Sequence, residues 1–343
     1  MIISLDATYS IGEELSGVGL YSAEILQGLA SAHPETQFDF RYRSHRFLAA
    51  RRAAFPANVS KRLLAEPLGP RTADLFHGLN QRLPRMKLRR TVATFHDLFV
   101  ISGEYSTPEF RTRFRDQAQD AATRADAIIA VSEFTRSQVI SLLGVDAAKV
   151  HVVHHGTRQL AYRAAQREKV ILTVGAVQTR KNIARLVEAF ETVDPEWRLM
   201  IAGAATGYGA AEILERIAKS PAAGRIQVLG YVSPEDLTGW YARAMIFAFP
   251  SLDEGFGMPV LEAMAAGVPV LTSNRSALPE VAGDAALLVE PSNTEEVSQA
   301  LRRLTVSEDL RADLERRGRA RVGQFTWERA VQETWNVYRK LLG

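Results

Sequence analysis

The chain has 343 residues, a formal net charge of +3 and no cysteine. This length is enough for two domains with sizeable hydrophobic cores. The absence of cysteine excludes disulfides, thiolate nucleophiles and cysteine-ligated metal sites. The sequence has no apolar run near the roughly 18 residues of a membrane span and no charged leader before Ile2, so we expect a cytoplasmic protein.

The first half of the chain alternates apolar segments of strand length with longer amphipathic segments. We expect strands at residues 1–7, 37–42, 73–78, 91–96, 127–132 and 150–155, and helices at about 18–31, 110–124 and 133–143. Such alternation is typical of a parallel sheet that carries helices on both faces.

The second half repeats this pattern without repeating the sequence. Strands are expected at 169–174, 197–202, 226–231, 245–249, 268–273 and 285–289, and helices at 183–191, 210–219, 234–244 and around Glu262. Residues 157–168 are polar without a strong apolar period, and we predict that they form the linker. The sequence therefore predicts an α/β protein with two doubly wound, Rossmann-like domains, residues 1–160 and 169–325, which face a central cleft.

The first expected strand is followed by a turn with two glycines, Gly17 and Gly19, that opens a helix. A turn of this kind lets the backbone approach a phosphate. It does not complete the dinucleotide fingerprint, because a third glycine or alanine would be needed at Ser22, and Asp39 lies inside the second strand instead of after it. A nicotinamide-dependent enzyme is therefore disfavoured.

Positive charge is concentrated between residues 41 and 90. Against two acidic residues, this segment holds thirteen basic ones: Arg41, Arg43, Arg46, Arg51, Arg52, Lys61, Arg62, Arg71, Arg82, Arg85, Lys87, Arg89 and Arg90. An anionic lipid surface or a phosphorylated acceptor would complement such charge, and a solvated arginine-rich face is an equal alternative. Nucleic acid is the weakest option, because no recognised binding motif accompanies the charge.

A polar pair, His96 and Asp97, ends the strand that begins at residue 91. Ligands of open parallel sheets bind outside the carboxyl ends of strands, so this pair is well placed to meet a ligand. A histidine that only caps its own strand is the alternative. The later pair, His154 and His155, is not expected to bind metal, because strand alternation would point the two side chains to opposite faces.

Two cations, Arg180 and Lys181, follow Gly175 at the expected start of a helix. Positive charge at a helix N-terminus opposes the helix dipole unless an anion is bound, so the pair indicates an anion site. We expect Lys181 to be exposed in the absence of a ligand. Tyr231 ends a further strand, where it is either a core residue or a ligand-binding residue.

Residues 245–267 are typical of a strand, a loop and a short helix. Pro259 suits the first helical position and Gly267 suits a left-handed cap. Amides of the glycine-containing loop, together with the helix dipole, favour a phosphate. Of the two flanking glutamates, Glu262 is suited to both hydroxyls of a ribose and Glu254 to hydroxyls of a group beyond the phosphates. An ordinary surface loop and an amphipathic helix are the alternative.

The sequence E-G-F-G-M-P-V-L-E, whose two glutamates are separated by seven residues, and the following A-M-A-A-G-V-P-V resemble the E-x7-E signature of retaining GT-B glycosyltransferases, family 4 of that classification. Further similar segments are S-G-V-G-x-Y, T-F-H-D, A-D-x-I-I-A-V-S and R-K-N, so the resemblance covers nearly the whole chain. It is weakest at residues 41–90, where acceptor specificity tends to lie. Ala176 stands where many relatives have a further arginine.

The resemblance implies roles for individual residues. His96 would contact the transferred sugar near the reacting carbon, Glu254 would hold the same sugar, and Glu262 would hold the ribose. Arg180 and Lys181 would clamp the leaving diphosphate. The other donor-binding positions would be Gly17, Gly19, Asp97, Gly175, Tyr231, Gly255, Phe256, Gly257 and Met258. No metal is expected, because the sequence lacks an Asp-x-Asp pair, and no other cofactor is expected. A terminal helix at about 326–343 would pack back on the first domain.

The implied reaction is the transfer of a hexose, mannose or similar, from a GDP- or UDP-sugar to a hydroxyl of a glycan or of a polyprenyl-diphosphate-linked acceptor. The resemblance is strongest to bacterial mannosyl- and rhamnosyltransferases of surface polysaccharide assembly. A sugar phosphorylase or epimerase on the same fold, and a nucleotide-sugar-binding protein without catalysis, are the alternatives. The basic segment favours a peripheral enzyme at the inner face of the cell membrane.

Overall fold

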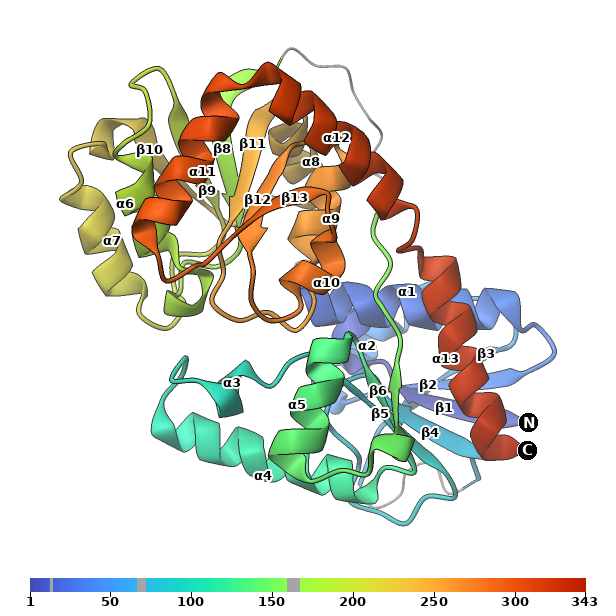
Figure 1. Cartoon of the computed structure of the whole chain (residues 1–343). Helices are drawn as coiled ribbons and strands as arrows, with labels where there is room; N and C mark the ends of the chain where they lie inside the picture. The colour runs from blue at the N-terminus through green and yellow to red at the C-terminus, as the bar shows by residue number, and fades with distance from the viewer. Residues whose placement is uncertain (13–14, 67–71, 159–166) are drawn as a thin grey trace. The chain divides into compact units, whose positions relative to one another are not determined.

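The computed structural model describes residues 1–12, 15–66, 72–158 and 167–343. They form two compact units, which we call unit 1 (Met1–Gly156 with Phe325–Gly343) and unit 2 (Thr157–Gln324). Each unit contains a parallel sheet with helices packed on it (Figure 1). Arg71 and residues 159–166 of the predicted linker lie outside the described residues.

Unit 1 is built on a seven-stranded parallel sheet. In spatial order its strands are β3 (Val59–Leu63), β2 (Gln37–Tyr42), β1 (Ile2–Asp6), β4 (Leu75–Gly78), β5 (Thr91–Phe95), β6 (Ala127–Ala130) and β7 (Val150–Val152). The central strands β4, β5 and β6 are buried along their whole length, which explains why they are short apolar runs and not alternating ones. Since β1 and β4 are neighbours, the chain changes direction across the sheet between them, and this is the switch point of unit 1.

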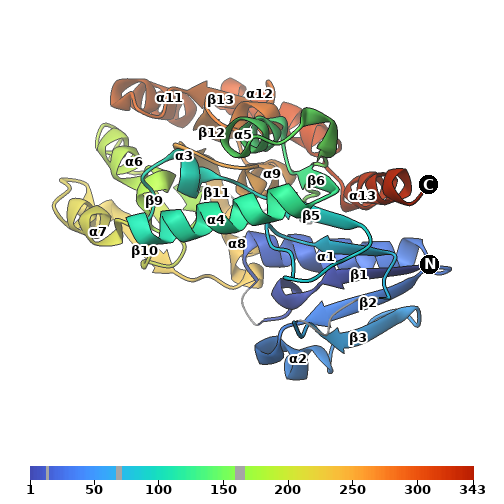
Figure 2. The same ribbon diagram turned by 90° about the horizontal axis from the view of Figure 1, so that it is seen from below.

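The helices of unit 1 cover both faces of this sheet (Figure 2). They are α1 (Gly17–Ala32), α2 (Ser44–Ala50), α3 (Phe99–Ser102), α4 (Pro108–Arg124), α5 (Glu133–Leu143) and α13 (Trp327–Leu342). Ser16, Thr107 and Ser132 begin α1, α4 and α5, and each side-chain oxygen accepts a hydrogen bond from a backbone N–H of the first turn. Helix α13, although last in the sequence, packs against α1 within unit 1.

Unit 2 is built on a six-stranded parallel sheet. In spatial order its strands are β10 (Ile226–Gly230), β9 (Arg198–Ala202), β8 (Glu168–Val174), β11 (Ala244–Phe249), β12 (Val270–Ser273) and β13 (Ala286–Val289). Its helices are α6 (Ile183–Phe190), α7 (Ala210–Ala218), α8 (Pro234–Arg243), α9 (Met258–Ala265), α10 (Leu278–Ala282), α11 (Thr294–Val306) and α12 (Glu308–Val322). The switch point lies between β8 and β11, which are neighbours.

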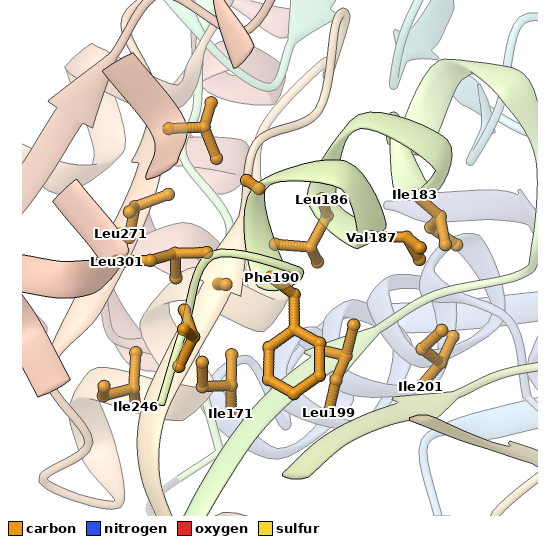
Figure 3. Packing of buried hydrophobic residues seen from close by; sticks show 14 of the residues in the cluster. Ile171, Ile183, Leu186, Val187, Phe190, Leu199, Ile201, Ile246, Leu271 and Leu301 are labelled. Atoms are coloured by element: carbon orange, nitrogen blue, oxygen red, sulfur yellow. The ribbon is translucent and has the colours of Figure 1, made fainter. Parts of the chain in front are cut away.

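A single buried cluster joins α6 and α11 to the sheet of unit 2 (Figure 3). Leu186 and Phe190 of α6 are fully buried with Ile171 of β8, Leu199 of β9 and Leu301 of α11. This core fixes the start of α6, and therefore the segment between β8 and α6, against the carboxyl edge of the sheet.

The predicted α/β class with two doubly wound sheets is confirmed. The main differences are elements that the sequence did not reveal: β3, α2, α3, α10, α11 and α12. The strand expected at residues 150–155 is limited to Val150–Val152, so strand alternation does not govern His154 and His155.

Candidate active site

The carboxyl ends of β8 and β11 lie side by side at the switch point of unit 2, the position where doubly wound sheets bind ligands. A 3-10 turn, Thr179–Lys181, follows β8, and a loop follows β11. The backbone N–H of Leu252 donates to the Arg180 carbonyl at 2.8 Å, and Asn182 Nδ2 donates to the Pro250 carbonyl at 3.0 Å. Two segments that are distant in the sequence therefore form one rigid edge.

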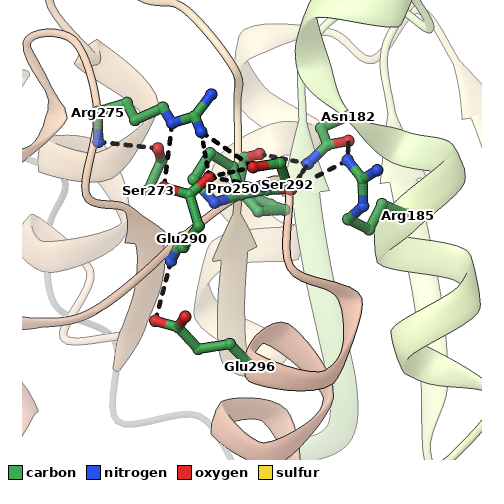
Figure 4. Close-up of polar contacts among 9 residues, drawn as sticks. Asn182, Arg185, Pro250, Ser273, Arg275, Glu290, Ser292 and Glu296 are labelled. Atoms are coloured by element: carbon green, nitrogen blue, oxygen red, sulfur yellow. Dashed lines mark hydrogen bonds and ion pairs between the residues drawn. The ribbon is translucent and has the colours of Figure 1, made fainter.

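Further polar contacts hold this edge from the side of β12 and β13 (Figure 4). Asn182 Nδ2 also donates to the Pro291 carbonyl at 2.6 Å, and Arg185 donates to Asn182 Oδ1 at 3.0 Å. Arg275 Nε donates to Glu290 Oε2 at 3.1 Å. The bonds of the Asn182 side chain hold this residue at the start of α6, where its backbone is left-handed with φ of 58°.

Three charged side chains meet at the centre of the edge. Arg180 NH1 lies 2.8 Å from Glu254 Oε2, and Lys181 Nζ lies 2.7 Å from Glu254 Oε1. The three side chains are only 9%, 12% and 10% exposed for Arg180, Lys181 and Glu254 respectively. The anion that Arg180 and Lys181 contact in this structure is a carboxylate of the chain itself, and the binding of a diphosphate by these cations stays a prediction.

The charge state of Glu254 follows from its two partners. Burial raises the pKa of this carboxyl, but the charges and hydrogen bonds of Arg180 and Lys181 outweigh burial and lower the pKa to about 2. Glu254 is therefore ionised at neutral pH, and two positive charges face one negative charge.

The prediction that Lys181 is exposed is wrong. Its ammonium group is paired with Glu254 and lies 4.5 Å from the centroid of the Phe249 ring, a favourable cation–π arrangement. A Cβ at Gly175 would lie 3.0 Å from Lys181 Cε, so the glycine leaves room for the lysine stem.

The loop after β11 leads into α9 as expected, with one correction. Met258, not Pro259, is the first helical residue, and Pro259 takes the second position. Gly257 has φ of 121°, and a Cβ there would lie 2.8 Å from Leu278 Cδ2. Gly255 and Phe256 are buried beside it. Gly267 has φ of 70°, which confirms the predicted left-handed cap.

Glu262 lies in α9 beside a residue that the sequence did not single out. Tyr241 of α8 donates its hydroxyl proton to Glu262 Oε2 at 3.0 Å. Burial raises the pKa of the Glu262 carboxyl, against the lowering influence of Tyr241 and Arg158. Burial also raises the pKa of Tyr241 well above its usual value, so its hydroxyl remains a donor. No sequence signal connected α8 with α9 in this way.

Glycines line the carboxyl ends of β8, β9 and β10. Gly175 has φ of 144° and Gly203 has φ of 157°, and a Cβ at Gly203 would lie 2.0 Å from the Gly175 carbonyl oxygen. Tyr231, which follows β10, is 49% exposed. The alternative that Tyr231 is a core residue is therefore wrong, and its aromatic ring is accessible at this edge.

In unit 1, His96 follows β5 and is buried. Its Nε2 lies 2.9 Å from the carbonyl oxygen of Leu79. A carbonyl only accepts, so Nε2 carries the proton and Nδ1 presents a lone pair. Burial lowers the pKa of His96 to about 4, which keeps the ring neutral at pH 7. Asp97 follows it and is half-buried.

Two residues missed by sequence reasoning surround His96. The His155 ring stacks on the His96 ring at 5.4 Å between centroids and 7° between planes. The Tyr21 ring stands edge-on to both histidines, at 4.8 Å and 4.9 Å. His155 follows β7, and the carboxyl ends of parallel strands share one edge, so its place after a strand was the available signal.

A buried polar chain connects Tyr21 with α13. The Tyr21 hydroxyl lies 3.0 Å from Thr94 Oγ1, and His77 Nε2 lies 2.8 Å from the same oxygen. His77 Nδ1 in turn bonds to the hydroxyl of Tyr338 in α13. Burial lowers the pKa of His77 to about 3, so this chain is uncharged. Helix α13 thus supports the residues that pack against His96.

The predicted glycine turn is the start of α1. Gly17 is exposed at the first helical position, whereas Gly19 is buried. A Cβ at Gly19 would lie 2.9 Å from the Tyr9 carbonyl oxygen, which accounts for this glycine by packing alone.

Across residues 1–12, 15–66, 72–158 and 167–343, the structure has no group of three or more histidine, aspartate or glutamate side chains arranged to hold a metal ion. In the same residues, every helix is too short or too polar to span a lipid bilayer.

Two family models match the chain. Residues 17–158 match the model described as Glycosyltransferase Family 4, and residues 160–321 match the model described as Glycosyl transferases group 1. Among curated proteins, O-antigen chain mannosyltransferase B of Escherichia coli is 30% identical over 98% of this chain and 99% of its own length.

Two solved structures illustrate the similarity of fold. Sucrose-phosphate synthase from Thermosynechococcus elongatus superposes with a TM-score of 0.81 at 21% identity, over 99% of this chain and 98% of that one. Anabaena Alr3699/HepE in complex with UDP-glucose superposes with a TM-score of 0.74 at 18% identity, over 99% and 98%.

Proposed function

This chain belongs to glycosyltransferase family 4, among the enzymes of polysaccharide assembly, and from that membership we propose that it transfers mannose or a similar hexose. The proposed donor is a GDP- or UDP-sugar, and the proposed acceptor is a hydroxyl of a glycan or of a lipid-linked molecule. The proposed transfer retains the anomeric configuration of the sugar. The fold of the chain is GT-B, as predicted. The domain boundaries and the roles of individual residues stay predictions.

The observation that carries the proposal is the pair of cations at the end of β8. The difficult step is the departure of an anionic diphosphate from a sugar carbon that gains positive character. Pre-placed positive groups aimed at the leaving oxygens lower such a barrier most effectively. Arg180 and Lys181 are held in place at the switch point, where a donor would bind.

The transfer exchanges one bond to the anomeric carbon for another. The bond to the diphosphate oxygen breaks, the bond to the acceptor oxygen forms on the same face of the sugar, and the acceptor proton passes to the departing diphosphate. Glu254 would accept hydrogen bonds from hydroxyls of the sugar, and Glu262 from those of the ribose. Tyr241 holds Glu262 for that role.

His96 would bind a hydroxyl group of the sugar through Nδ1. Because Nε2 donates to Leu79, Nδ1 can only accept, and a sugar hydroxyl is a suitable donor. The neutral ring would orient the sugar and would not act as a general acid near pH 7.

The donor class is supported by the named relatives: one is an O-antigen mannosyltransferase, and one solved structure contains UDP-glucose. The test is a panel of GDP- and UDP-sugars, with thermal stabilisation as the measure of binding because a bound ligand raises the unfolding temperature. The product of the best donor should retain the anomeric configuration by NMR. Loss of activity in EDTA with recovery in manganese or magnesium would overturn the metal-independent part of the proposal.

Membrane association is the second part of the proposed function, and the structure divides the predicted basic segment. Of the twelve described basic residues, Arg41 and Arg62 pair with Asp39, and Arg89 pairs with Asp74. The other exposed basic residues lie mainly in two groups, one in and directly after α2 and one at residues 85–90. The groups are separated because α2 follows the carboxyl end of β2, whereas residues 85–90 precede the amino end of β5. Figure 2 shows α2 and the N-terminus at opposite ends of β2 and β1.

We propose that the surface around α2 contacts the membrane. Arg46, Arg51 and Arg52 are exposed there, and Leu48 between them is 74% exposed. An exposed leucine among arginines suits an anionic lipid surface, where the cations meet headgroups and the leucine enters the interface. This surface shares the carboxyl edge of the sheet with His96, so a lipid-linked acceptor would arrive at the edge where the sugar is proposed to bind.

A further inference from the structure

The carboxylate of Glu254 lies between the two cations that are proposed to clamp the donor diphosphate. Each of its oxygens contacts one cation, Oε2 with Arg180 at 2.8 Å and Oε1 with Lys181 at 2.7 Å. Both oxygens are therefore engaged, as the oxygens of a phosphate group would be. A diphosphate that approached the same cations would meet a negative charge already in its place.

The two cations have contacts that do not depend on Glu254. Arg180 NH1 also donates to the Asp253 carbonyl, and the Arg180 carbonyl accepts from the Leu252 N–H at 2.8 Å. Lys181 Nζ lies over the Phe249 ring. The cations would consequently stay near their present positions if the Glu254 side chain turned away.

The main chain of Glu254 is fixed, which limits any change to its side chain. Its N–H donates to Ser276 Oγ at 3.1 Å, and its carbonyl accepts from the Ala277 N–H at 3.2 Å. A rotation of the side chain could exchange its partners without rearranging the loop.

From these contacts, and resting on the proposed function, we infer that Glu254 is an internal competitor for the diphosphate clamp and that donor binding is an exchange. The diphosphate takes Arg180 and Lys181, and the released carboxylate takes hydroxyls of the transferred sugar. Glu254 would thus respond to the sugar and to the diphosphate in one movement.

This exchange distinguishes the donor from the nucleoside diphosphate that remains after transfer. With the donor bound, the displaced carboxylate gains sugar hydroxyls as new partners. With the nucleoside diphosphate alone, it has no such partners and competes to return to the cations. Glu254 would therefore weaken the binding of the product relative to the donor, and so favour product release.

The test compares calorimetric affinities of the wild type and Glu254→Gln for GDP, UDP and the matching nucleotide sugars. We expect Glu254→Gln to bind the nucleoside diphosphate about tenfold more tightly, within the usual range of coupling between two bound groups. Its affinity for the nucleotide sugar should rise less, because the amide replaces the carboxylate as hydroxyl acceptor. Glu168→Gln is the matched control, since it also removes a carboxylate that is paired with two cations, Arg198 and Arg243, but lies at the opposite end of β8, and it should leave all affinities unchanged.

Equal or weaker nucleoside diphosphate binding by a folded Glu254→Gln protein would overturn the inference. A wild type that binds no nucleotide sugar would instead refute the proposed function. Should the variant fail to fold, a crystal structure of the wild type with the nucleoside diphosphate decides. The exchange requires the Glu254 oxygens to lie beyond the roughly 4 Å of an ion pair from both cations, and their persistence between Arg180 and Lys181 would contradict it.

Discussion

At the scale of single residues, Lys181 combines burial, an ion pair and an aromatic contact in one position. We predict that Lys181→Ala lowers turnover by at least about a hundredfold, the size expected when one group that stabilises the departing charge is removed. The measurement is the steady-state rate with the best nucleotide sugar, alongside the unfolding temperature.

Lys169→Ala is the matched control for this prediction. Lys169 is the second residue of β8, at the opposite end of this strand from the turn that carries Lys181, and it is half-exposed and pairs with Glu196. Its replacement should leave turnover within about twofold, as for a surface ion pair remote from the site. A folded Lys181→Ala protein with near wild-type turnover would remove this lysine from the mechanism.

The buried histidines of unit 1 make its stability depend on pH. Burial lowers the pKa of His77 to about 3 and of His96 to about 4, and it lowers the pKa of His155 well below 6.5. Between about pH 4 and 6.5 the unfolded chain binds protons that the folded chain does not, so stability falls as pH decreases through this window. Each such histidine contributes about 1.4 kcal/mol per pH unit.

His77→Gln tests this dependence outside the proposed site. Denaturant unfolding at pH 7.5, 6.5, 5.5 and 4.5 should give a free energy of unfolding that declines less steeply in His77→Gln than in the wild type, by about 1.4 kcal/mol per pH unit below pH 6.5. Identical slopes for the two proteins would show that His77 is not the source of the acid sensitivity.

Residue pairings across the fold were the part of the site that local patterns could not predict. Arg180 and Lys181 were predicted to form an anion site and Glu254 to be a site carboxylate, yet the ion pair of Lys181 with Glu254 joins positions 73 apart in the sequence, which local patterns do not connect. The contacts of His155 and Tyr21 with His96 were missed for the same reason, because only the assembled sheet edge brings these residues together.

At the scale of elements, the contact between α1 and α13 depends on a glycine. A Cβ at Gly28 of α1 would lie 2.3 Å from Val331 Cγ2 of α13. We predict that Gly28→Ala destabilises the protein by about 1–3 kcal/mol through overpacking, although alanine is the better helix former by about 1 kcal/mol. The double variant Gly28→Ala with Val331→Ala should recover most of that loss, because the smaller side chain makes room. Additive losses in the double variant, measured by denaturant unfolding, would contradict a direct clash.

The elements that were predicted correctly are those with strong apolar patterns. Buried parallel strands such as Thr91–Phe95 are short apolar runs, and α5 begins at a clear capping serine. Strand β3 was missed because it lies at the sheet edge and carries Lys61 and Arg62. Helix α12 was missed because its sequence is mostly charged and only Leu314 and Gly318 are buried.

At the scale of the whole molecule, the distribution of charge matters more than its sum. A net charge of +3 conceals thirteen basic residues between positions 41 and 90. In the sequence they form one cluster, whereas the parallel sheet separates α2 from residues 85–90 by placing them at opposite edges. These edges provide two cationic surfaces, and the one around α2 lies at the same carboxyl edge as His96.

Vesicle sedimentation can decide which of these surfaces meets a membrane. We predict that replacing Arg46, Arg51 and Arg52 by Gln weakens binding to anionic vesicles at low salt by roughly a hundredfold, because each cation near such a surface contributes about 1 kcal/mol. The matched control replaces Arg85, Lys87 and Arg90, three basic residues of the other group, by Gln. This control should bind like the wild type. Binding of the wild type should fall as salt increases, because screening shortens the reach of these charges. If the control variant lost more binding than the α2 variant, the membrane contact would lie at the amino edge of the sheet. If the wild type bound neutral and anionic vesicles equally and negligibly, membrane association would be refuted, whereas the proposed sugar transfer would be unaffected.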